Sequence, residues 1–221
     1  MVAGTARMLA RHRDELAAGA QHLGWKVGFG APAAMERLGL DRPLVGALTT
    51  ERRLEPGASV SLGGWTHGLI EAEIAAYVGR DVGPTATADE ALAAVGGWSL
   101  AVELADLDLP PDDVVEILGG NIYHRWVLFG ELVPELPEQR GVTVLRDGLE
   151  VAATDRPDDL VGELGWVLAT TASTLAAAGG ALRAGDVVIT GSMVPPMDVV
   201  PDQTWRVAAA GLGEVAVHLL P

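Results

Sequence analysis

The stretches LIEAEIAAYVG (residues 69–79) and SLAVELADLDL (residues 99–109) decide the predicted fold and its site. Side chains alternate between the two faces of a strand, so Glu71 and Glu73 share one face. Glu103 likewise lies opposite the apolar residues of its own stretch. If the two strands are neighbours, three carboxylates converge, an arrangement suited to Mg²⁺ or Mn²⁺ with oxygen ligands. Pattern alone also allows solvated faces of half-buried strands.

The composition is that of a packed, acidic, globular protein. Of the 221 residues, 49% are hydrophobic and the mean hydropathy is +0.27, which argues against disorder. A net charge of −15 argues against nucleic-acid binding, because phosphates require a basic surface. The absence of cysteine excludes disulfides, thiolate metal sites and a cysteine nucleophile.

Neither a secretion signal nor a membrane span is predicted. Arginine and aspartate interrupt the N-terminal residues 1–19, which therefore lack the apolar core of a signal peptide. Glycine or polar residues also interrupt every apolar stretch that approaches the length of a span. We therefore expect a soluble, cytoplasmic protein without membrane or nucleic-acid partners.

Many short strands and a few helices are predicted along the chain. Apolar periodicity predicts helices over residues 5–22, 32–40, 110–119 and 158–178, of which the last has the clearest apolar face. Many strands with few helices indicate a single α+β domain built on a curled mixed sheet.

Three shorter signals refine this prediction. Thr87 and Glu90 have the spacing of a capping box at the start of another short helix. Asp147-Gly148 predicts the turn of a hairpin over residues 140–154. The segment IYHRWVLFGELV, residues 122–133, is expected to be a strand.

Five sequence blocks follow one another in a characteristic order. They are GWKVG (24–28), LGLDRPLVGALTT (38–50), EAEIAAYV (71–78), AGGALRAGDVVITGS (178–192) and AGLGEVAV (210–217). In this order they resemble the 2-keto-4-pentenoate hydratase / 4-oxalocrotonate decarboxylase family of the fumarylacetoacetate hydrolase superfamily. The resemblance implies a mixed β-roll in one catalytic domain, residues 1–221. Residues 1–23 would be a shortened N-terminal helical segment and residues 24–221 the core.

The resemblance also implies an activity. It indicates a divalent-metal-dependent lyase acting on a small 2-keto acid, with Mg²⁺ or Mn²⁺ held by Glu71, Glu73 and Glu103. The reaction would be hydration of a 2-hydroxydienoate (2-keto-4-pentenoate type) or decarboxylation of a 4-oxalocrotonate type substrate, through a metal-stabilised enolate. Lys26 matches the family's K-[IV]-G lysine and would stabilise the oxyanion or relay a proton.

Two segments depart from the family pattern and supply further candidate residues. Where the family commonly has acidic residues after the G-x-L block, only Glu51 offers a carboxylate, which makes it a candidate for proton transfer. Where the family has small and hydroxyl residues after an asparagine, this chain is bulkier and more basic. Asn121, His124 and Arg125 are therefore candidates for substrate binding, with Arg125 as a fork for a second carboxylate. Ser192, at a strand end, is a further expected substrate contact.

Two other functions remain open at this point. An acylpyruvate-type C–C bond hydrolase would need an additional His–Glu pair to activate water, and the N-terminal region shows no obvious pair. A non-catalytic family member acting as a partner subunit would explain the altered segments 49–53 and 121–126. The apolar composition also predicts a homo-oligomer, a dimer at minimum. A complex with a related lyase subunit is a further expectation.

Overall fold

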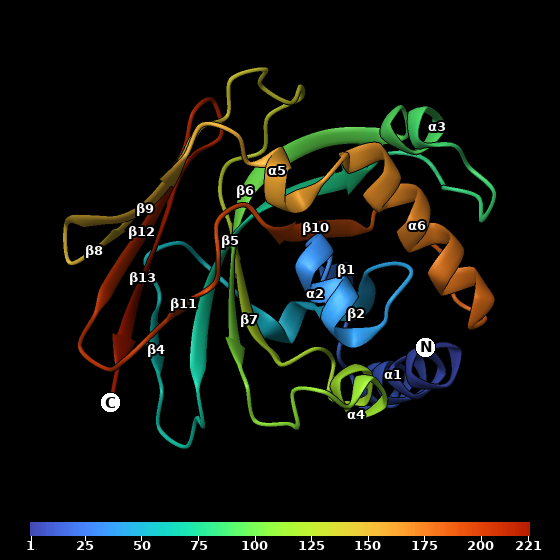
Figure 1. Cartoon of the computed structure of the whole chain (residues 1–221), viewed down its shortest axis with the longest axis horizontal. Helices are drawn as coiled ribbons and strands as arrows, with labels where there is room; N and C mark the ends of the chain where they lie inside the picture. Colours follow the sequence, from blue (N-terminus) through green and yellow to red (C-terminus); the bar gives the residue numbers. More distant parts are fainter.

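Two mixed β-sheets form the centre of the protein in the computed structural model, which describes residues 1–221 (Figure 1). The larger, eight-stranded sheet contains, in spatial order, β2 (Leu44–Thr49), β1 (His22–Gly28), β10 (Val187–Ser192), β5 (Gly68–Val78), β6 (Val95–Asp106), β7 (His124–Phe129) and β3 (Arg53–Leu54), with β11 (Met197–Asp198) paired to β5. The five-stranded sheet contains β4 (Ser59–Ser61), β13 (Gly213–Leu220), β12 (Thr204–Ala209), β8 (Val142–Arg146) and β9 (Leu149–Thr154).

Helices cover part of the larger sheet. They are α1 (Val2–Ala17), α2 (Pro32–Leu38), α3 (Ala88–Leu92), α4 (Val114–Gly119), α5 (Asp158–Val161) and α6 (Leu164–Ala177). Helices α1 and α6 contact β2, α6 also contacts β10, and the five-stranded sheet contacts β6 through β12 and β13. The helices and the smaller sheet therefore cover different parts of the outer face of the larger sheet, and Figure 1 shows them at opposite ends of the molecule.

The larger sheet curls because the chain passes from one edge to the other within three residues. β2 is one edge strand, β3 is the other, and only the 3₁₀ turn η1 (Thr50–Arg52) separates them. Near this closure, the Asn121 amide donates to the Ala47 carbonyl at 2.8 Å and accepts from the Ala47 amide at 2.7 Å. This side chain satisfies the edge of β2 as a further strand would.

The curl separates an apolar outer face from an inner face that carries charge. The main core of 40 buried residues includes the outer residues of β5 and β6, namely Ile70, Ala72, Ile74, Leu100, Val102 and Leu104. A much smaller cluster of 7 buried apolar residues lies on the inner face. Lys26, Glu73 and Glu103 are buried on that inner face as well. The predicted alternation along both strands is therefore present.

Two of the local turn and cap signals are confirmed. Thr87 Oγ1 accepts from the Glu90 amide at 3.2 Å, and the Glu90 carboxylate accepts from the Thr87 amide at 2.8 Å. Asp147 and Gly148 have φ values of 53° and 79°, and they join β8 to β9 as a tight hairpin.

Two predicted elements differ in the structure. The helix expected over residues 158–178 is two helices, because Gly162 adopts a φ of 83° between α5 and α6. The strand expected over residues 122–133 is confined to β7, since Ile122 and Tyr123 have left-handed φ values of 52° and 63°. A single-residue pattern of apolar and polar positions does not report such left-handed turns.

One helical stretch has the composition of a membrane span. Residues Asp158–Ala177 have a mean hydropathy of 1.3, and half of this stretch is buried inside the protein. A core helix of a globular protein meets the same criteria of length and composition.

Removing the Asn121 amide should destabilise the closed sheet. In Asn121→Ala, two backbone groups of Ala47 lose their partners, so we expect the free energy of unfolding to fall by about 2–4 kcal/mol. Asp202→Ala is the matched control, because Asp202 has a similar φ of 64° but its side chain forms no hydrogen bond. Urea denaturation of both variants measures the difference, and equal losses in the two would contradict this role of Asn121.

Candidate active site

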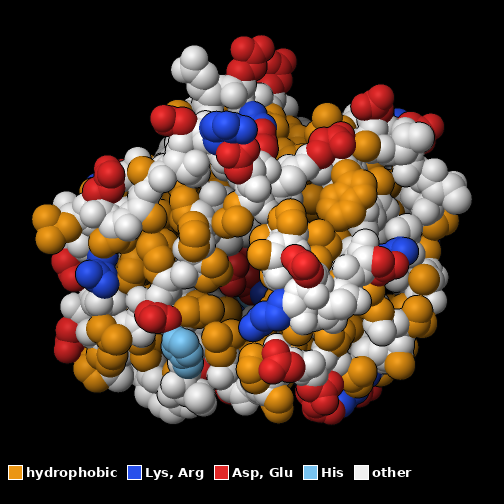
Figure 2. Space-filling model, viewed as in Figure 1, with side chains coloured by type: hydrophobic (Ala, Val, Ile, Leu, Met, Phe, Trp, Pro, Cys, Tyr) orange, Lys and Arg blue, Asp and Glu red, His pale blue; other side chains and the backbone are white.

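A cavity of about 370 Å³ opens on the inner face of the larger sheet. Lys26, Glu71 and Glu103 contribute to its polar end. Its apolar walls include Phe29, Leu69, Leu107, Ile122, Leu160 and Val161. Figure 2 shows the hollow in the middle of one face, with acidic and basic atoms inside it and hydrophobic atoms around it. The site therefore combines a small charged end with a mostly apolar enclosure.

The three glutamates lie on one face of the sheet, as the strand pattern predicts. β5 and β6 pair antiparallel with Glu71 directly opposite Glu103, and Glu73 follows two residues later on the same face. Glu71 is partly exposed and lines the cavity, whereas Glu73 and Glu103 have exposed fractions of 0% and 1%. Two of the three carboxylates are thus shielded from solvent, and the third faces the cavity.

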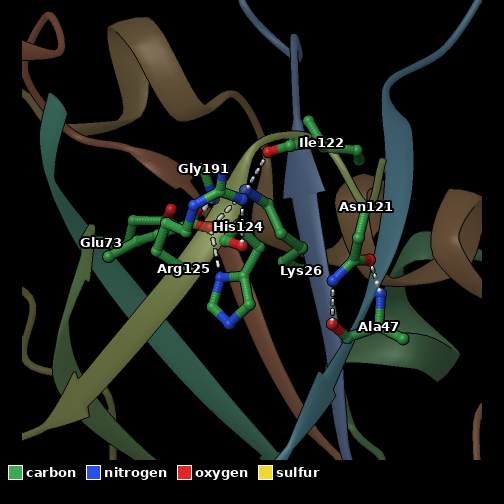
Figure 3. Close-up of polar contacts among 9 residues, drawn as sticks. Lys26, Ala47, Glu73, Asn121, Ile122, His124, Arg125 and Gly191 are labelled. Atoms are coloured by element: carbon green, nitrogen blue, oxygen red, sulfur yellow. Dashed lines mark hydrogen bonds and ion pairs between the residues drawn. The ribbon is translucent and has the colours of Figure 1, made fainter. Parts of the chain in front are cut away.

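Lys26 lies across the sheet interior from Glu103. Its Nζ donates to Glu103 Oε1 and, at 3.0 Å, to the carbonyl of Ile122, as Figure 3 shows for Ile122. An ammonium group has three N–H donors, so one donor remains for a ligand in the cavity that Lys26 lines. Gly46 lies beside it in β2, where a Cβ atom would come within 2.9 Å of Lys26 Cγ. Glycine at this position therefore makes room for the lysine.

The carbonyl that receives Lys26 belongs to an unusual turn. Asn121, Ile122 and Tyr123 have consecutive φ values of 62°, 52° and 63°, a left-handed conformation that costs each non-glycine residue of order 1–2 kcal/mol. The Asn121–Ala47 hydrogen bonds hold one end of this turn, and β7 begins directly after it. The strained turn thus presents the Ile122 carbonyl to Lys26 Nζ.

His124 supports the same carboxylate from β7. It is buried, with an exposed fraction of 4%, and its Nδ1 lies 2.7 Å from Glu103 Oε1. Burial lowers the pKa of His124 more than its hydrogen bond to Glu103 raises it. His124 is therefore a neutral imidazole near pH 7 that donates from Nδ1, and this leaves Nε2 buried without a partner.

The carboxylates differ in electrostatic environment. Burial raises the pKa of Glu103, but the Lys26 charge and the His124 hydrogen bond outweigh it and lower the pKa to about 2. Burial, followed by repulsion from Glu103, raises the pKa of Glu71 to about 7. Burial and the two neighbouring carboxylates raise the pKa of Glu73 as well. The single ammonium group of Lys26 therefore neutralises Glu103, and no cation pairs with Glu71 or Glu73.

The three glutamates fit a divalent cation in donor type and burial. Glu71 forms no hydrogen bond, Glu73 accepts the Gly191 amide at 2.6 Å through Oε2 only, and Glu103 uses only Oε1. Glu73 Oε1 is buried without a partner. As placed, no three acidic or imidazole groups stand close enough to share one ion, so side-chain rotation would have to bring these free oxygens together.

Two predicted site residues lie away from the cavity, which corrects the expectation for them. Glu51 is exposed and accepts from the Gln21 amide at 3.2 and 3.3 Å, at the end of β1 remote from the cavity. Arg125 does not line the cavity, because its guanidinium binds Asp106 at 3.1 Å and Asp108 at 2.6 Å. Neighbouring residues of a strand face opposite sides, so His124 and Arg125 could not both face a ligand.

Asn121, His124 and Ser192 also differ from the expected direct substrate contacts. The Asn121 side-chain amide hydrogen-bonds to the backbone of Ala47. His124 lies behind Glu103 and does not line the cavity. Ser192 does line the cavity, but its hydroxyl donates to the Val194 carbonyl at 2.6 Å. Only Ser192 of these three could meet a ligand directly.

Several cavity residues were not predicted from the sequence. They include Phe29, Arg37, Tyr123 and Thr190.

The composition gives a second, independent signal for Lys26, because it is the only lysine in a chain that otherwise uses arginine for its basic residues. Arginine cannot release a proton near neutral pH, so a single buried lysine is a specific mark of this site.

Without metal, the protein should lose stability as the pH rises from 5 to 8. Glu71 holds a proton up to a pKa of about 7 in the folded state, but the unfolded chain releases it near 4.5, so rising pH favours unfolding between these values. We expect a melting temperature on the order of 5 °C lower at pH 8 than at pH 5.5, measured by circular dichroism in EDTA. Glu71→Gln should reduce this dependence, and an unchanged slope would contradict the assignment.

Comparisons with known proteins agree with this architecture. The chain is 28% identical over 207 residues to the TodF product hydratase of Pseudomonas putida, covering 90% of this chain and 77% of that protein. It is 26% identical over 233 residues to a 4-oxalocrotonate decarboxylase of a Pseudomonas species, covering 95% and 82%. Both are relatives of this chain at modest identity.

The fold is also that of a solved protein. The structure of 4-oxalocrotonate decarboxylase from Pseudomonas putida G7, complexed with calcium and acetate, matches with a TM-score of 0.88 and 23% identity, covering 97% of this chain and 85% of that one. The α+β fold class and the family resemblance are therefore confirmed. The model of the fumarylacetoacetate (FAA) hydrolase C-terminal family matches residues 7–219, so the chain belongs to that family.

Proposed function

We propose that this chain is a divalent-metal-dependent lyase acting on a small 2-keto acid. The observation that carries the proposal is the buried Lys26–Glu103 pair, which lies beside two uncompensated carboxylates at the polar end of an apolar cavity. The two relatives described above are a hydratase and a decarboxylase, and both activities fit this proposal. A structural neighbour, 4-oxalocrotonate decarboxylase, is complexed with magnesium and adipate.

Glu71, Glu73 and Glu103 would hold the metal, Mg²⁺ or Mn²⁺, through the oxygens that form no other hydrogen bond. When bound, such a cation polarises the keto oxygen of a 2-keto acid and stabilises the negative charge that develops there. Its positive charge would also offset the repulsion among the three carboxylates.

Lys26 is the group that would move or hold a proton in this site. Two of its three N–H donors are engaged by Glu103 and Ile122, which fixes the third relative to the cavity. That donor can hydrogen-bond a developing oxyanion or transfer a proton to the substrate. His124, neutral and buried, orients Glu103 and so keeps Lys26 in place.

Both candidate reactions require such a proton donor. Hydration adds a proton to one carbon and a hydroxyl group from water to another carbon of the dienol. Decarboxylation breaks the bond to a carboxylate, which leaves as CO₂, and a proton then adds to the carbon chain. The apolar walls would keep other water molecules away from the carbanionic intermediate. The site supports either reaction, and both belong to the same lyase class.

The two alternative functions have less support. A hydrolase of acylpyruvates would need a histidine to activate water, and no histidine lines the cavity. A non-catalytic subunit would not need a buried lysine placed against a carboxylate at a cavity. Assembly into a homo-oligomer, and a complex with a related lyase subunit, remain part of the proposal. A light-scattering mass near 22.9 kDa would contradict self-assembly.

Replacing Lys26 should separate chemistry from binding. We expect Lys26→Ala and Lys26→Arg to lower turnover of a 2-hydroxydienoate or 4-oxalocrotonate substrate by about two to four orders of magnitude, the usual contribution of general acid–base catalysis. Lys26→Arg tests proton transfer specifically, since it retains the positive charge.

Steady-state absorbance kinetics measures turnover, and calorimetry with oxalate and Mg²⁺ measures binding in the same variants. Circular dichroism confirms that each variant is folded, because removing one partner of a buried ion pair can cost about 3–5 kcal/mol. Full turnover by folded Lys26→Ala would show that another residue moves the proton.

A further inference from the structure

Ionic side chains occupy two separate places around the cavity. Lys26, Glu71 and Glu103 lie together on the strands at one end. The only other charged side chain that lines the cavity is Arg37, on the short helix α2. The lining is otherwise rich in apolar residues. An elongated ligand would therefore meet charge at its head and again at one other point.

Arg37 lies near the outer part of the cavity, beside Tyr123. The Tyr123 ring points its hydroxyl toward the carbonyl of Pro110, 3.5 Å away, and Pro111 also lines the cavity. The positive charge of Arg37 acts on the Tyr123 hydroxyl, where it opposes the larger effect of burial on the pKa. Arg37 itself is exposed. Figure 2 shows basic atoms at the edge of the hollow as well as within it.

The guanidinium of Arg37 is uncommitted. It forms no ion pair and no hydrogen bond, whereas the Arg125 guanidinium binds two aspartates. This freedom is notable in a chain with 30 acidic and 15 basic residues, where a carboxylate partner is easy to find. An unpaired guanidinium at the opening of a cavity is available to bind a planar anion through two N–H donors.

We propose that Arg37 is a specificity-determining residue that selects 2-keto acids carrying a second carboxylate at the far end of a short carbon chain. This inference rests on the proposed function, which places the 2-keto acid head at Lys26 and the glutamates. The apolar walls accommodate the carbon chain between the two ends, and Arg37 pairs with the distal carboxylate. A substrate that ends in a methyl or vinyl group would leave this arginine without a partner.

Matched pairs of unreactive ligands test the inference by calorimetry in the presence of Mg²⁺. The pairs are 2-oxoglutarate with 2-oxopentanoate, 2-oxoadipate with 2-oxohexanoate, and 2-oxopimelate with 2-oxoheptanoate, so that only the distal carboxylate differs within a pair. For the chain length that spans the cavity, we expect the wild-type protein to bind the diacid about tenfold more tightly, as for a charge-assisted hydrogen bond.

The variant Arg37→Met keeps an unbranched apolar side chain but removes the charge. It should abolish the preference for the diacid and leave binding of the monoacids within about twofold of wild type. Arg13→Met is the matched control, because Arg13 is an exposed, unpaired arginine on α1 that does not line the cavity. It should retain the preference.

The remaining outcomes separate this inference from the proposed function. Equal binding of diacids and monoacids at every chain length, or a preference that survives in Arg37→Met, would overturn the role of Arg37 alone. Equal losses for both members of a pair in Arg37→Met would show a structural effect and also overturn it. Failure of every 2-keto acid to bind with Mg²⁺ would overturn the proposed function and this inference together.

Discussion

The ion pair between Lys26 and Glu103 is the interaction around which the site is organised. It joins β1 to β6 through the interior of the curled sheet, and both side chains are almost fully buried. Isolated charges in such a place would cost several kcal/mol each, so the pair requires close partners on every side. The Ile122 carbonyl and the His124 imidazole supply them. The left-handed turn before β7 is the structural cost of placing that carbonyl.

The surrounding fold explains why three carboxylates stay close together despite their repulsion. The outer face of β5 and β6 is packed into the main core with the smaller sheet and the helices. This burial fixes the strand register that sets Glu71 opposite Glu103. One ammonium group cannot balance three carboxylates, and burial together with repulsion between the carboxylates raises the pKa values of Glu71 and Glu73. A divalent cation at these carboxylates would supply the missing charge, so the proposed activity and the electrostatics of the interior have the same origin.

The sequence predicts the strands and the shared face of Glu71, Glu73 and Glu103 well. These features depend on alternation within a strand, which is a local property. The family blocks added Lys26 and the mixed β-roll. The sequence is a poor guide to Glu51 and Arg125, because their positions depend on contacts between distant segments. Arg125 lies one residue from His124, yet Asp106 and Asp108 hold it away from the cavity.

Asn121 and Arg37 are two further residues whose roles could not be predicted from the sequence. Asn121 matches a family position, but only the closure of the sheet reveals that its amide binds Ala47. Arg37 lies in a short helix with no buried residue and carries no pattern that marks it, and only the curl brings it to the cavity. Residues whose role depends on the closed shape of the sheet therefore require the three-dimensional structure.

Anomalous diffraction from crystals soaked in Mn²⁺ would locate the proposed metal site. We expect one strong peak per chain, with oxygens of Glu71, Glu73 and Glu103 all within about 2.0–2.3 Å of the ion, close to the distances of hard octahedral cations. The peak should be lost in Glu73→Gln crystals soaked at the same concentration. A peak bound by other residues, or no peak between these carboxylates at millimolar Mn²⁺, would show that the three glutamates do not form a metal site.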